Sequence, residues 1–191
     1  MAQDPAPVTI RVATIEDQLS MVSLINQAFV VETFLEGERT SAPELRAMFD
    51  TGEFLVAIAN GVMVASVYTE VRGERGYFGM LSVRASRQGT GLGRTMIQAA
   101  EQHCRAKGCK SMELTVLSLR AELPPLYRKF GYNETGREPF QTTRLIEGYP
   151  PCELNPHVEG VIDGCRGVQG GLNTGVVVAF CCGAEAPPAI I

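Results

Sequence analysis

A glycine-rich stretch follows an apolar run near the middle of the chain. Gly89, Gly91 and Gly93 alternate with other residues directly before an expected helix. Glycines at this spacing let the backbone turn tightly and bring several N–H groups toward one anion. The helix adds its unpaired N-terminal donors and the positive end of its dipole. The stretch therefore predicts a phosphate-binding loop, with a plain glycine turn as the alternative.

Spacing excludes two common nucleotide-binding loops. A Walker loop requires Gly-Lys-Ser/Thr where this chain has Gly-Arg-Thr at residues 93–95. A dinucleotide fingerprint requires two residues between its second and third glycines, where this chain has Leu92 alone. The pattern that fits is Gln-x-x-Gly-x-Gly, at Gln88, Gly91 and Gly93.

This pattern resembles the acetyl-CoA loop of the GNAT superfamily of N-acetyltransferases. A second stretch, Leu-Tyr-Arg-Lys-Phe-Gly-Tyr at residues 126–132, is similar to the segment that follows the fifth strand in that family. The resemblance covers about residues 10–146. It implies an enzyme that transfers the acetyl group of acetyl-CoA to a primary amine, of a small molecule or of a peptide or protein, by direct attack in a ternary complex. The alternative is a GNAT domain that binds acyl-CoA or a protein partner without turnover.

The resemblance also assigns cofactor contacts. In the family, backbone groups at the end of the fourth strand bind the pantetheine, and the loop binds the pyrophosphate. Many members carry a basic residue where this chain has Thr90. By position, the contacts fall on Leu81, Val83, Gln88, Gly89, Thr90, Gly91, Leu92, Gly93 and Arg94.

Two side chains are candidates for proton transfer. Tyr127 occupies the position whose phenol protonates the CoA thiolate in many GNAT enzymes, and a phenol of pKa about 10 suits that role. A tyrosine that only packs its helix on the sheet is the alternative. Some members carry a glutamate base where this chain has Thr115, and Glu113 lies two residues earlier on the same face. Glu113 is the candidate base; the alternative is that it is a solvated edge residue and that water accepts the proton.

Size and charge limit the other classes of function. The 191 residues are 45% hydrophobic, which suits one domain with a buried core. With 17 basic and 21 acidic residues and a net charge of -4, the chain lacks the electrostatic footprint of a nucleic-acid-binding protein. The sequence has neither a basic, apolar N-terminal leader nor a long apolar run. We therefore expect a cytoplasmic monomer or homodimer without a membrane partner.

Cysteine and histidine content argues against metal chemistry. The six cysteines form no Cys-x-x-Cys pair, so we expect reduced thiols rather than zinc ligands. The two histidines, His103 and His157, offer little material for a metal site or a Ser-His-Asp triad. We expect no metal cofactor.

The first half of the chain predicts the elements that hold the loop. Alternating apolar residues predict a strand over 8–12. Thr14, with Asp17 at the capping-box distance, predicts a helix that extends to about residue 29, and Ser41 begins a second helix over 42–49. The dipeptide Asn-Gly at residues 60–61 predicts a hairpin turn. Its strands span 54–59 and 62–71, and a third strand spans 77–83.

The second half predicts a crossover. A helix over 92–107 separates the strand 77–83 from a strand over 111–116, which makes these two strands parallel. A short helix over 126–130 and candidate strands over 132–135 and 142–146 follow. This order resembles GNAT topology and gives an α+β fold class, with a mixed, mostly antiparallel sheet and a central parallel strand pair flanked by helices.

Composition changes near the end of the chain. We assign residues 8–147 to the GNAT domain and 148–191 to an atypical Gly/Cys-rich tail, which could be poorly ordered. The tail holds eight glycines and four cysteines, and only 176–180 has a strand-like pattern. GNAT proteins normally finish with an antiparallel strand pair here, and the tail pattern does not predict one. Two explanations of this unusual tail are compatible with the sequence: an altered transcript end and a family-specific loop.

Overall fold

The computed structural model describes residues 7–139, 144–147, 149, 153–156 and 158–161. Their strands form a seven-stranded sheet, in the order β1-β2-β3-β4-β5-β10-β7, and a three-stranded sheet, β6-β9-β8. The strands are β1 (Thr9–Val12), β2 (Glu53–Ala59), β3 (Val62–Arg72), β4 (Arg75–Val83), β5 (Ser111–Glu113), β6 (Thr115–Leu117), β7 (Asn133–Glu134), β8 (Glu138–Pro139), β9 (Glu153–Pro156) and β10 (Val158–Val161). The helices are α1 (Gln18–Ala28), α2 (Ala42–Thr51), α3 (Leu92–Ala106) and α4 (Leu123–Lys129), with short 3-10 turns η1 (Ile15–Asp17) and η2 (Ala85–Arg87).

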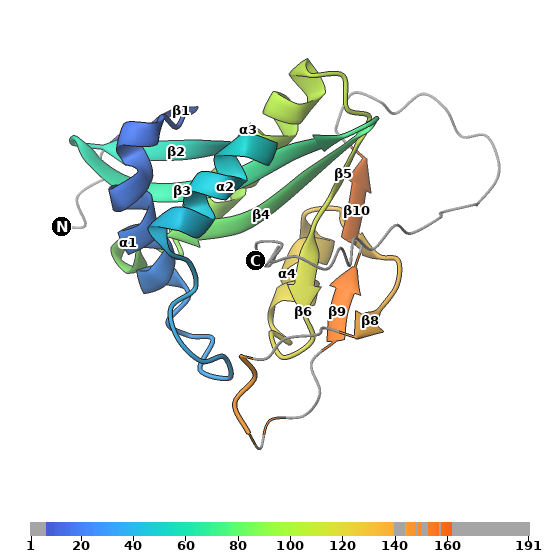
Figure 1. The fold of residues 1–191 in the computed structure, drawn as a ribbon. Helices are drawn as coiled ribbons and strands as arrows, with labels where there is room; N and C mark the ends of the chain where they lie inside the picture. Colours follow the sequence, from blue (N-terminus) through green and yellow to red (C-terminus); the bar gives the residue numbers. More distant parts are fainter. Residues whose placement is uncertain (1–6, 140–143, 148, 150–152, 157, 162–191) are drawn as a thin grey trace.

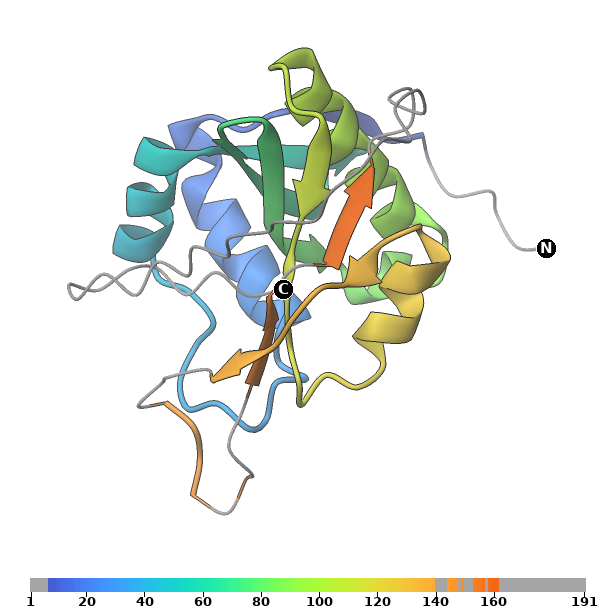
Figure 2. The same cartoon turned by 90° about the vertical axis from the view of Figure 1, so that its right-hand side faces the viewer.

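The helices cover both faces of the larger sheet. Helices α1 and α2 lie on one face and α3 on the other, with the strands between them (Figures 1 and 2). Each helix buries an apolar stripe at helical spacing, which drives its packing on the sheet. The stripe of α3 consists of Leu92, Met96, Ile97, Ala100 and Cys104. The stripes of α1 and α2 consist of Met21, Leu24, Ile25, Leu45 and Met48.

The elements that local sequence signals predict in the first half of the chain are present in the structure. Asn60 and Gly61 both have positive φ, at 50° and 74°, and they connect β2 to β3. Thr14 begins η1 with Asp17 in a capping box, and Ser41 begins α2 in the same way. These predictions are confirmed because each depends on residues that are neighbours in the sequence.

The parallel strand pair is short and opens into a fork. Strands β4 and β5 form only three residue pairs, and the last joins Tyr77 to Glu113. Beyond that point β6 pairs with β9 in the smaller sheet, and β4 and β6 separate (Figure 1). The single strand predicted over 111–116 is therefore two strands, interrupted at Leu114.

Strand β4 contains a bulge beside the fork. Its register with β3 shifts between Ser66 and Tyr68, so that two β4 residues, Met80 and Leu81, oppose one residue of β3. Met80 has a φ of 52°, a left-handed conformation that costs a non-glycine residue about 1–2 kcal/mol. A bulge bends its strand and redirects its backbone groups, so this strain shapes the fork.

Two strands that the sequence does not predict lie beyond residue 147. Strand β9 pairs with β6 and β8, and β10 pairs with β5 and β7, all antiparallel. Pro156 and Gly160 interrupt any strand pattern in the sequence, so only the pairing reveals these strands. In the predicted strand 142–146, residues 142 and 143 lie outside the described residues, and Leu145 forms a bridge with Leu35. The predicted strand 176–180 also lies outside them.

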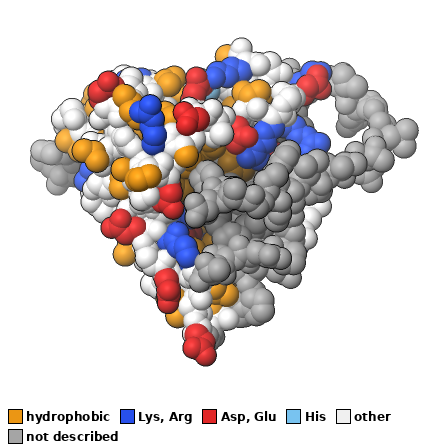
Figure 3. Space-filling view, viewed as in Figure 1, with side chains coloured by type: hydrophobic (Ala, Val, Ile, Leu, Met, Phe, Trp, Pro, Cys, Tyr) orange, Lys and Arg blue, Asp and Glu red, His pale blue; other side chains and the backbone are white. Residues whose placement is uncertain are grey.

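The expected fold class is confirmed. The sheet is mixed and mostly antiparallel, its parallel pair is central, and helices flank it. No helix within the described ranges has the length and apolar character needed to cross a membrane. Acidic and basic side chains are interspersed over the face that carries α1 and α2 (Figure 3).

Replacement of Gly76 tests how tightly α3 packs on the parallel pair. A Cβ atom there would lie 2.7 Å from Cβ of Cys104 on α3 and would also collide with the Met112 sulfur. We expect Gly76→Ala to lower the free energy of unfolding by about 1–3 kcal/mol, because the packed core cannot accommodate the extra methyl group. Gly136→Ala is the matched control, since nothing lies within 4 Å of its added Cβ. Equal urea midpoints for the two variants would contradict this packing.

Candidate functional site

The glycine loop connects β4 and η2 to the beginning of α3. Gly89 and Gly91 have φ values of 75° and 85°, so both positions favour glycine for conformational reasons. Gly93 has no positive φ, and a Cβ there would reach only the Val83 side chain, at 3.9 Å. Neither strain nor crowding therefore requires glycine at position 93. A ligand that approaches the backbone closely at this position is the remaining physical reason for a glycine there.

Within the part of the chain that the structure describes, helix α3 begins without a side-chain cap. Gly91 is the N-cap residue, it makes no side-chain cap hydrogen bond, and the first turn contains no acidic residue. Helix α2, by contrast, is capped by Ser41 and Glu44. The first helical hydrogen bond of α3 runs from the Thr95 N–H to the Gly91 carbonyl. The N–H groups of residues 92–94 therefore have no partner within the helix and can bind an anion.

Side chains of the loop stiffen it. The Thr90 hydroxyl donates a hydrogen bond to the Arg87 carbonyl at 2.7 Å, within the loop itself. The Arg94 guanidinium lies over the Phe130 ring, 5.6 Å from its centroid, and so connects α3 to the residue that follows α4. Thr90 is engaged inside the loop, while Arg94 adds a positive charge at the beginning of α3.

The end of β4 turns backbone groups toward the fork. The Arg84 N–H donates to the Val64 carbonyl of β3 at 2.9 Å. Because backbone groups alternate in direction along a regular strand, those of Val83 face the other edge. The Gln88 side-chain amide donates to the Val83 carbonyl at 3.1 Å. The loop is thereby attached to the strand end whose backbone groups face the fork.

Tyr127 lies in an aromatic cluster on the α3 side of the sheet. Its side chain is 1% exposed and packs against Phe78, Phe130 and Tyr132, with ring centroids 6.1–6.5 Å apart. Burial raises the pKa of the phenol above its usual value, and the positive charge of Arg120 opposes part of that effect. Tyr127 is therefore protonated at neutral pH and has a proton to donate.

Glu113 is held in an ion-pair network rather than at a solvated edge. The residue is 7% exposed, which rules out the solvated-edge alternative. Its carboxylate accepts a hydrogen bond from Arg72 Nη1 at 3.1 Å and lies 3.7 Å from Arg75 Nη1. Thr115, at the position of the family glutamate, is the first residue of β6.

Sequence reasoning missed a buried ionic cluster between distant segments. Glu32, after α1, is 5% exposed, and its carboxylate lies 3.1 Å from Arg120 Nη1 and 3.7 Å from Arg39 Nε. Burial raises the pKa of Glu32 despite the two guanidiniums. Arg120 is 88 positions away along the chain, so no local spacing could have indicated this contact.

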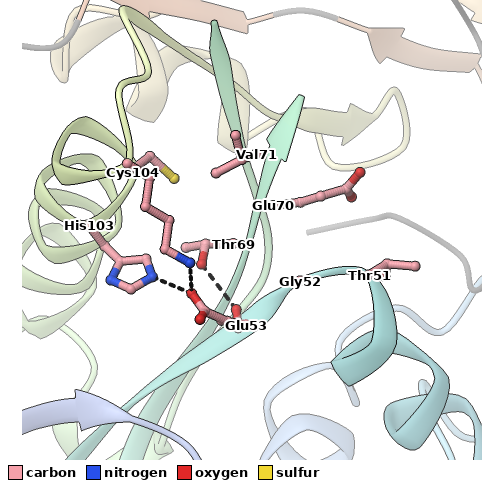
Figure 4. Close-up of a pocket in the computed structure, with 9 residues that line it drawn as sticks. Thr51, Gly52, Glu53, Thr69, Glu70, Val71, His103 and Cys104 are labelled. Atoms are coloured by element: carbon pink, nitrogen blue, oxygen red, sulfur yellow. Dashed lines mark hydrogen bonds and ion pairs between the residues drawn. The ribbon is translucent and has the colours of Figure 1, made fainter. Parts of the chain in front are cut away.

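A hollow of about 140 Å³ lies at the other end of α3 (Figure 4). Its residues include Glu53 of β2 and His103 and Lys107 at the end of α3. The His103 ring and the Lys107 ammonium both contact the Glu53 carboxylate, which lowers the pKa of Glu53. Helix α3 has 15 residues, so this cluster lies about 22 Å from the glycine loop. The cluster secures the helix end and is separate from the loop.

The described ranges contain no group of three or more His, Cys, Asp or Glu residues that could hold a metal ion. Cys104 and Cys109 are both buried free thiols. Burial raises the pKa of Cys104 to about 12, so its thiol is protonated and unreactive at neutral pH.

Comparisons with known proteins agree with this fold. A family model described as the acetyltransferase (GNAT) family matches residues 21–132. A search of curated proteins found no match.

Solved structures share the architecture. A ribosomal-protein-alanine N-acetyltransferase from Escherichia coli is 18% identical, with 82% of this chain and 94% of that chain covered and a TM-score of 0.67. A putative acetyltransferase from Salmonella typhimurium, solved with acetyl-CoA, is 20% identical, with 82% and 95% covered and a TM-score of 0.61. An N-acetyltransferase from Thermoplasma acidophilum, solved with coenzyme A, is 15% identical, with 81% and 99% covered and a TM-score of 0.63. At these identities, the likeness concerns the fold.

Replacement of Glu113 tests its role in the ion-pair network. We expect Glu113→Gln to lower the free energy of unfolding by about 1–2 kcal/mol, because two arginines would lose their shared buried carboxylate. The control is Glu74→Gln, which removes an exposed carboxylate paired with Lys110 and should change stability by no more than about 0.5 kcal/mol. If urea unfolding gave equal values for both variants, the network would contribute nothing beyond a surface ion pair.

Proposed function

Because the chain belongs to the acetyltransferase (GNAT) family, we propose that it transfers the acetyl group of acetyl-CoA to a primary amine by direct attack in a ternary complex. The observation that carries the proposal is that, among the described residues, the N-terminus of α3 has no side-chain cap and adjoins an edge of β4 that no strand covers. The loop suits a pyrophosphate, because its free donors are backbone N–H groups and its glycines leave space. The open edge suits an extended amide chain, which can hydrogen-bond to it like a further strand.

We assign each part of acetyl-CoA to a part of the site. Backbone N–H groups between Gln88 and Arg94 bind the pyrophosphate, and the backbone of Leu81 and Val83 binds the pantetheine amides. The bulge at Met80 turns β4 at the place where the thioester carbonyl lies. An N–H group there stabilises the oxyanion that forms when the amine attacks.

The acceptor amine approaches from the opposite side of the fork. There the segment after α1 is joined to residues 144–146 through backbone hydrogen bonds from Glu36 to Arg144 and from Ile146 to Phe34. Phe34 packs against Leu117 at the end of β6. We propose that these segments form the wall that selects the acceptor.

Two proton transfers complete the reaction. The amine nitrogen forms a bond to the acetyl carbon, the C–S bond breaks, and the departing thiolate takes the phenolic proton of Tyr127. The amine gives up its own proton to water. Water suits this step better than Glu113, because the Glu113 carboxylate already serves two arginines. Tyr127 regains its proton from solvent after CoA leaves.

The loop assignment is tested by a charge placed at Gly91. Gly91→Glu puts a carboxylate beside the N–H groups that would bind phosphate, so acetyl-CoA affinity should fall at least about 100-fold. Gly108→Glu is the matched control, because its glycine also has positive φ and open space but lies after the other end of α3. Both variants carry similar backbone strain. Calorimetry should show a loss of binding in the first variant alone; unchanged affinity in folded Gly91→Glu would refute the assignment.

The role of Tyr127 is tested by removal of its hydroxyl. Tyr127→Phe keeps the aromatic packing, so acetyl-CoA affinity should change little while turnover falls by about 10²–10⁴-fold. The loss should shrink with acetyl thioesters whose thiols are less basic, because a better leaving group needs less protonation. Release of free thiol over a panel of amines provides the readout. An equal loss with every thioester would leave Tyr127 as a packing residue, and wild-type protein that binds acetyl-CoA but acetylates no amine would identify a binding domain without turnover.

A further inference from the structure

The hydroxyl group of Tyr77 is buried without a partner from the described part of the chain. Tyr77 is 1% exposed, and its hydroxyl oxygen makes no hydrogen bond of ordinary length and angle among the described residues. Such a group destabilises the fold, because it has lost its hydrogen bonds to water and gained none. A phenylalanine would fill the same space without this cost. A ligand that hydrogen-bonds to the phenol would explain why the position carries a tyrosine.

A neighbouring tyrosine shows that the fold can supply partners to a buried phenol. Tyr68 is 4% exposed, and its ring centroid lies 6.4 Å from that of Tyr77. Its hydroxyl lies 2.8 Å from the Thr51 hydroxyl and donates to Glu70 Oε2 at 3.4 Å. The two tyrosines belong to the same core cluster. Of these two phenols, only that of Tyr77 is without a hydrogen bond in the described structure.

The Tyr77 hydroxyl lies at the beginning of the fork. Tyr77 is the last residue of β4 that pairs with β5. A Cβ atom added to Gly79 would lie 2.7 Å from the Tyr77 hydroxyl oxygen and 3.2 Å from the ring carbon that carries it. The phenol therefore extends along β4, and its oxygen lies over the backbone of Gly79, beyond the last ladder pair. A residue larger than glycine at position 79 would occupy the place of the hydroxyl.

This hydroxyl is on the face of the sheet that carries the proposed acceptor wall. Tyr77 packs in the cluster between the sheet and helices α1 and α2, whereas Tyr127 packs in the cluster on the α3 face. Met80, the next residue after Gly79, forms the bulge at which the thioester carbonyl is assigned. An amine bound to the Tyr77 hydroxyl would therefore lie beside the bulge, on the acceptor side of the fork.

The phenol of Tyr77 is neutral, and its ring is held in place. Burial raises the pKa of Tyr77 to about 12, against the opposing effects of the Arg72 charge and of the Thr115 side chain. The Arg72 guanidinium lies over the ring, 4.0 Å from its centroid. At neutral pH the hydroxyl therefore keeps its own proton, while its oxygen can accept a hydrogen bond. Such a group suits the positioning of a substrate better than the removal of a proton from it.

We propose that the Tyr77 hydroxyl accepts a hydrogen bond from the N–H of the acceptor amine and directs the nitrogen lone pair toward the thioester carbonyl carbon. The inference rests on the proposed acetyl transfer. The nitrogen gains positive charge as its bond to the acetyl carbon forms, so its N–H becomes a stronger donor. The hydrogen bond to Tyr77 is then stronger in the transition state than in the ground state. Tyr77 exchanges no proton, and the amine proton passes to water.

Tyr77→Phe keeps the ring and removes that hydroxyl. We expect kcat/KM for the amine to fall about 10–100-fold, because a hydrogen bond to a nitrogen that gains positive charge is lost. Affinity for acetyl-CoA, measured by calorimetry, should change less than twofold. The loss should be equal with acetyl thioesters of more and less basic thiols, because Tyr77 acts on the amine and not on the leaving group. That pattern distinguishes Tyr77 from Tyr127, whose hydroxyl should matter less as the thiol becomes less basic.

Stability provides a readout that does not depend on turnover. Since the hydroxyl has no hydrogen bond in the described structure, Tyr77→Phe should leave the urea midpoint unchanged or raise it. Tyr68→Phe is the matched control, because it removes a paired hydroxyl from the same cluster. It should lower the urea midpoint and leave kcat/KM for the amine within about twofold of the wild-type value.

Three outcomes would overturn the inference. If Tyr77→Phe lowers the urea midpoint as much as Tyr68→Phe does, the hydroxyl has a structural partner, for which Thr115 is the candidate. If folded Tyr77→Phe acetylates the amine at the wild-type rate, the hydroxyl does not touch the acceptor, and the proposed function stands. If the wild-type protein acetylates no amine in the panel, the proposed function fails and this inference fails with it.

Discussion

Three residue pairs join β4 to β5, and the open edge of β4 lies beyond the third. Because the pairing ends at Tyr77 and Glu113, the backbone of β4 past this point has β3 on one side and, in the described part of the chain, no strand on the other. The left-handed conformation of Met80 bends the strand in the same region. A longer ladder would close the fork, and a shorter one would detach β5 from the sheet. The length of this ladder therefore sets how much of the β4 edge no strand covers in the described part of the chain.

Much of this arrangement could be predicted from the sequence, because the signals are local. A capping box spans four residues, a hairpin turn needs Asn60 and Gly61 alone, and the glycine loop adjoins the helix that it begins. The stripe of α3 recurs at helical spacing, and its residues are buried as that spacing requires. Such features need no knowledge of distant parts of the chain.

The features that the sequence did not reveal depend on contacts between distant residues. The interruption at Leu114 follows from β6 pairing with β9, a strand that itself has no pattern to identify it. The Glu32–Arg120 pair joins residues from opposite halves of the chain. The sequence pattern left open that Glu113 is an edge residue. In the fold, the arginines of β3 and β4 contact its carboxylate. In each case tertiary contacts determine the outcome, and local propensity carries no information about them.

The N-terminus of α3, which has no side-chain cap in the described part of the chain, would also connect the stability of the domain to the anion that we propose binds there. With Gly91 as its N-cap residue, the first turn of α3 is less stable by roughly a few tenths of a kcal/mol than one capped by Ser, Thr, Asp or Asn. An anion bound there supplies the missing partner and shifts the folding equilibrium by mass action. The contents of the cell would then influence how long this protein survives. When the anion is abundant the helix end is protected, and when it is scarce the same end is where α3 frays first, exposing the loop to proteases.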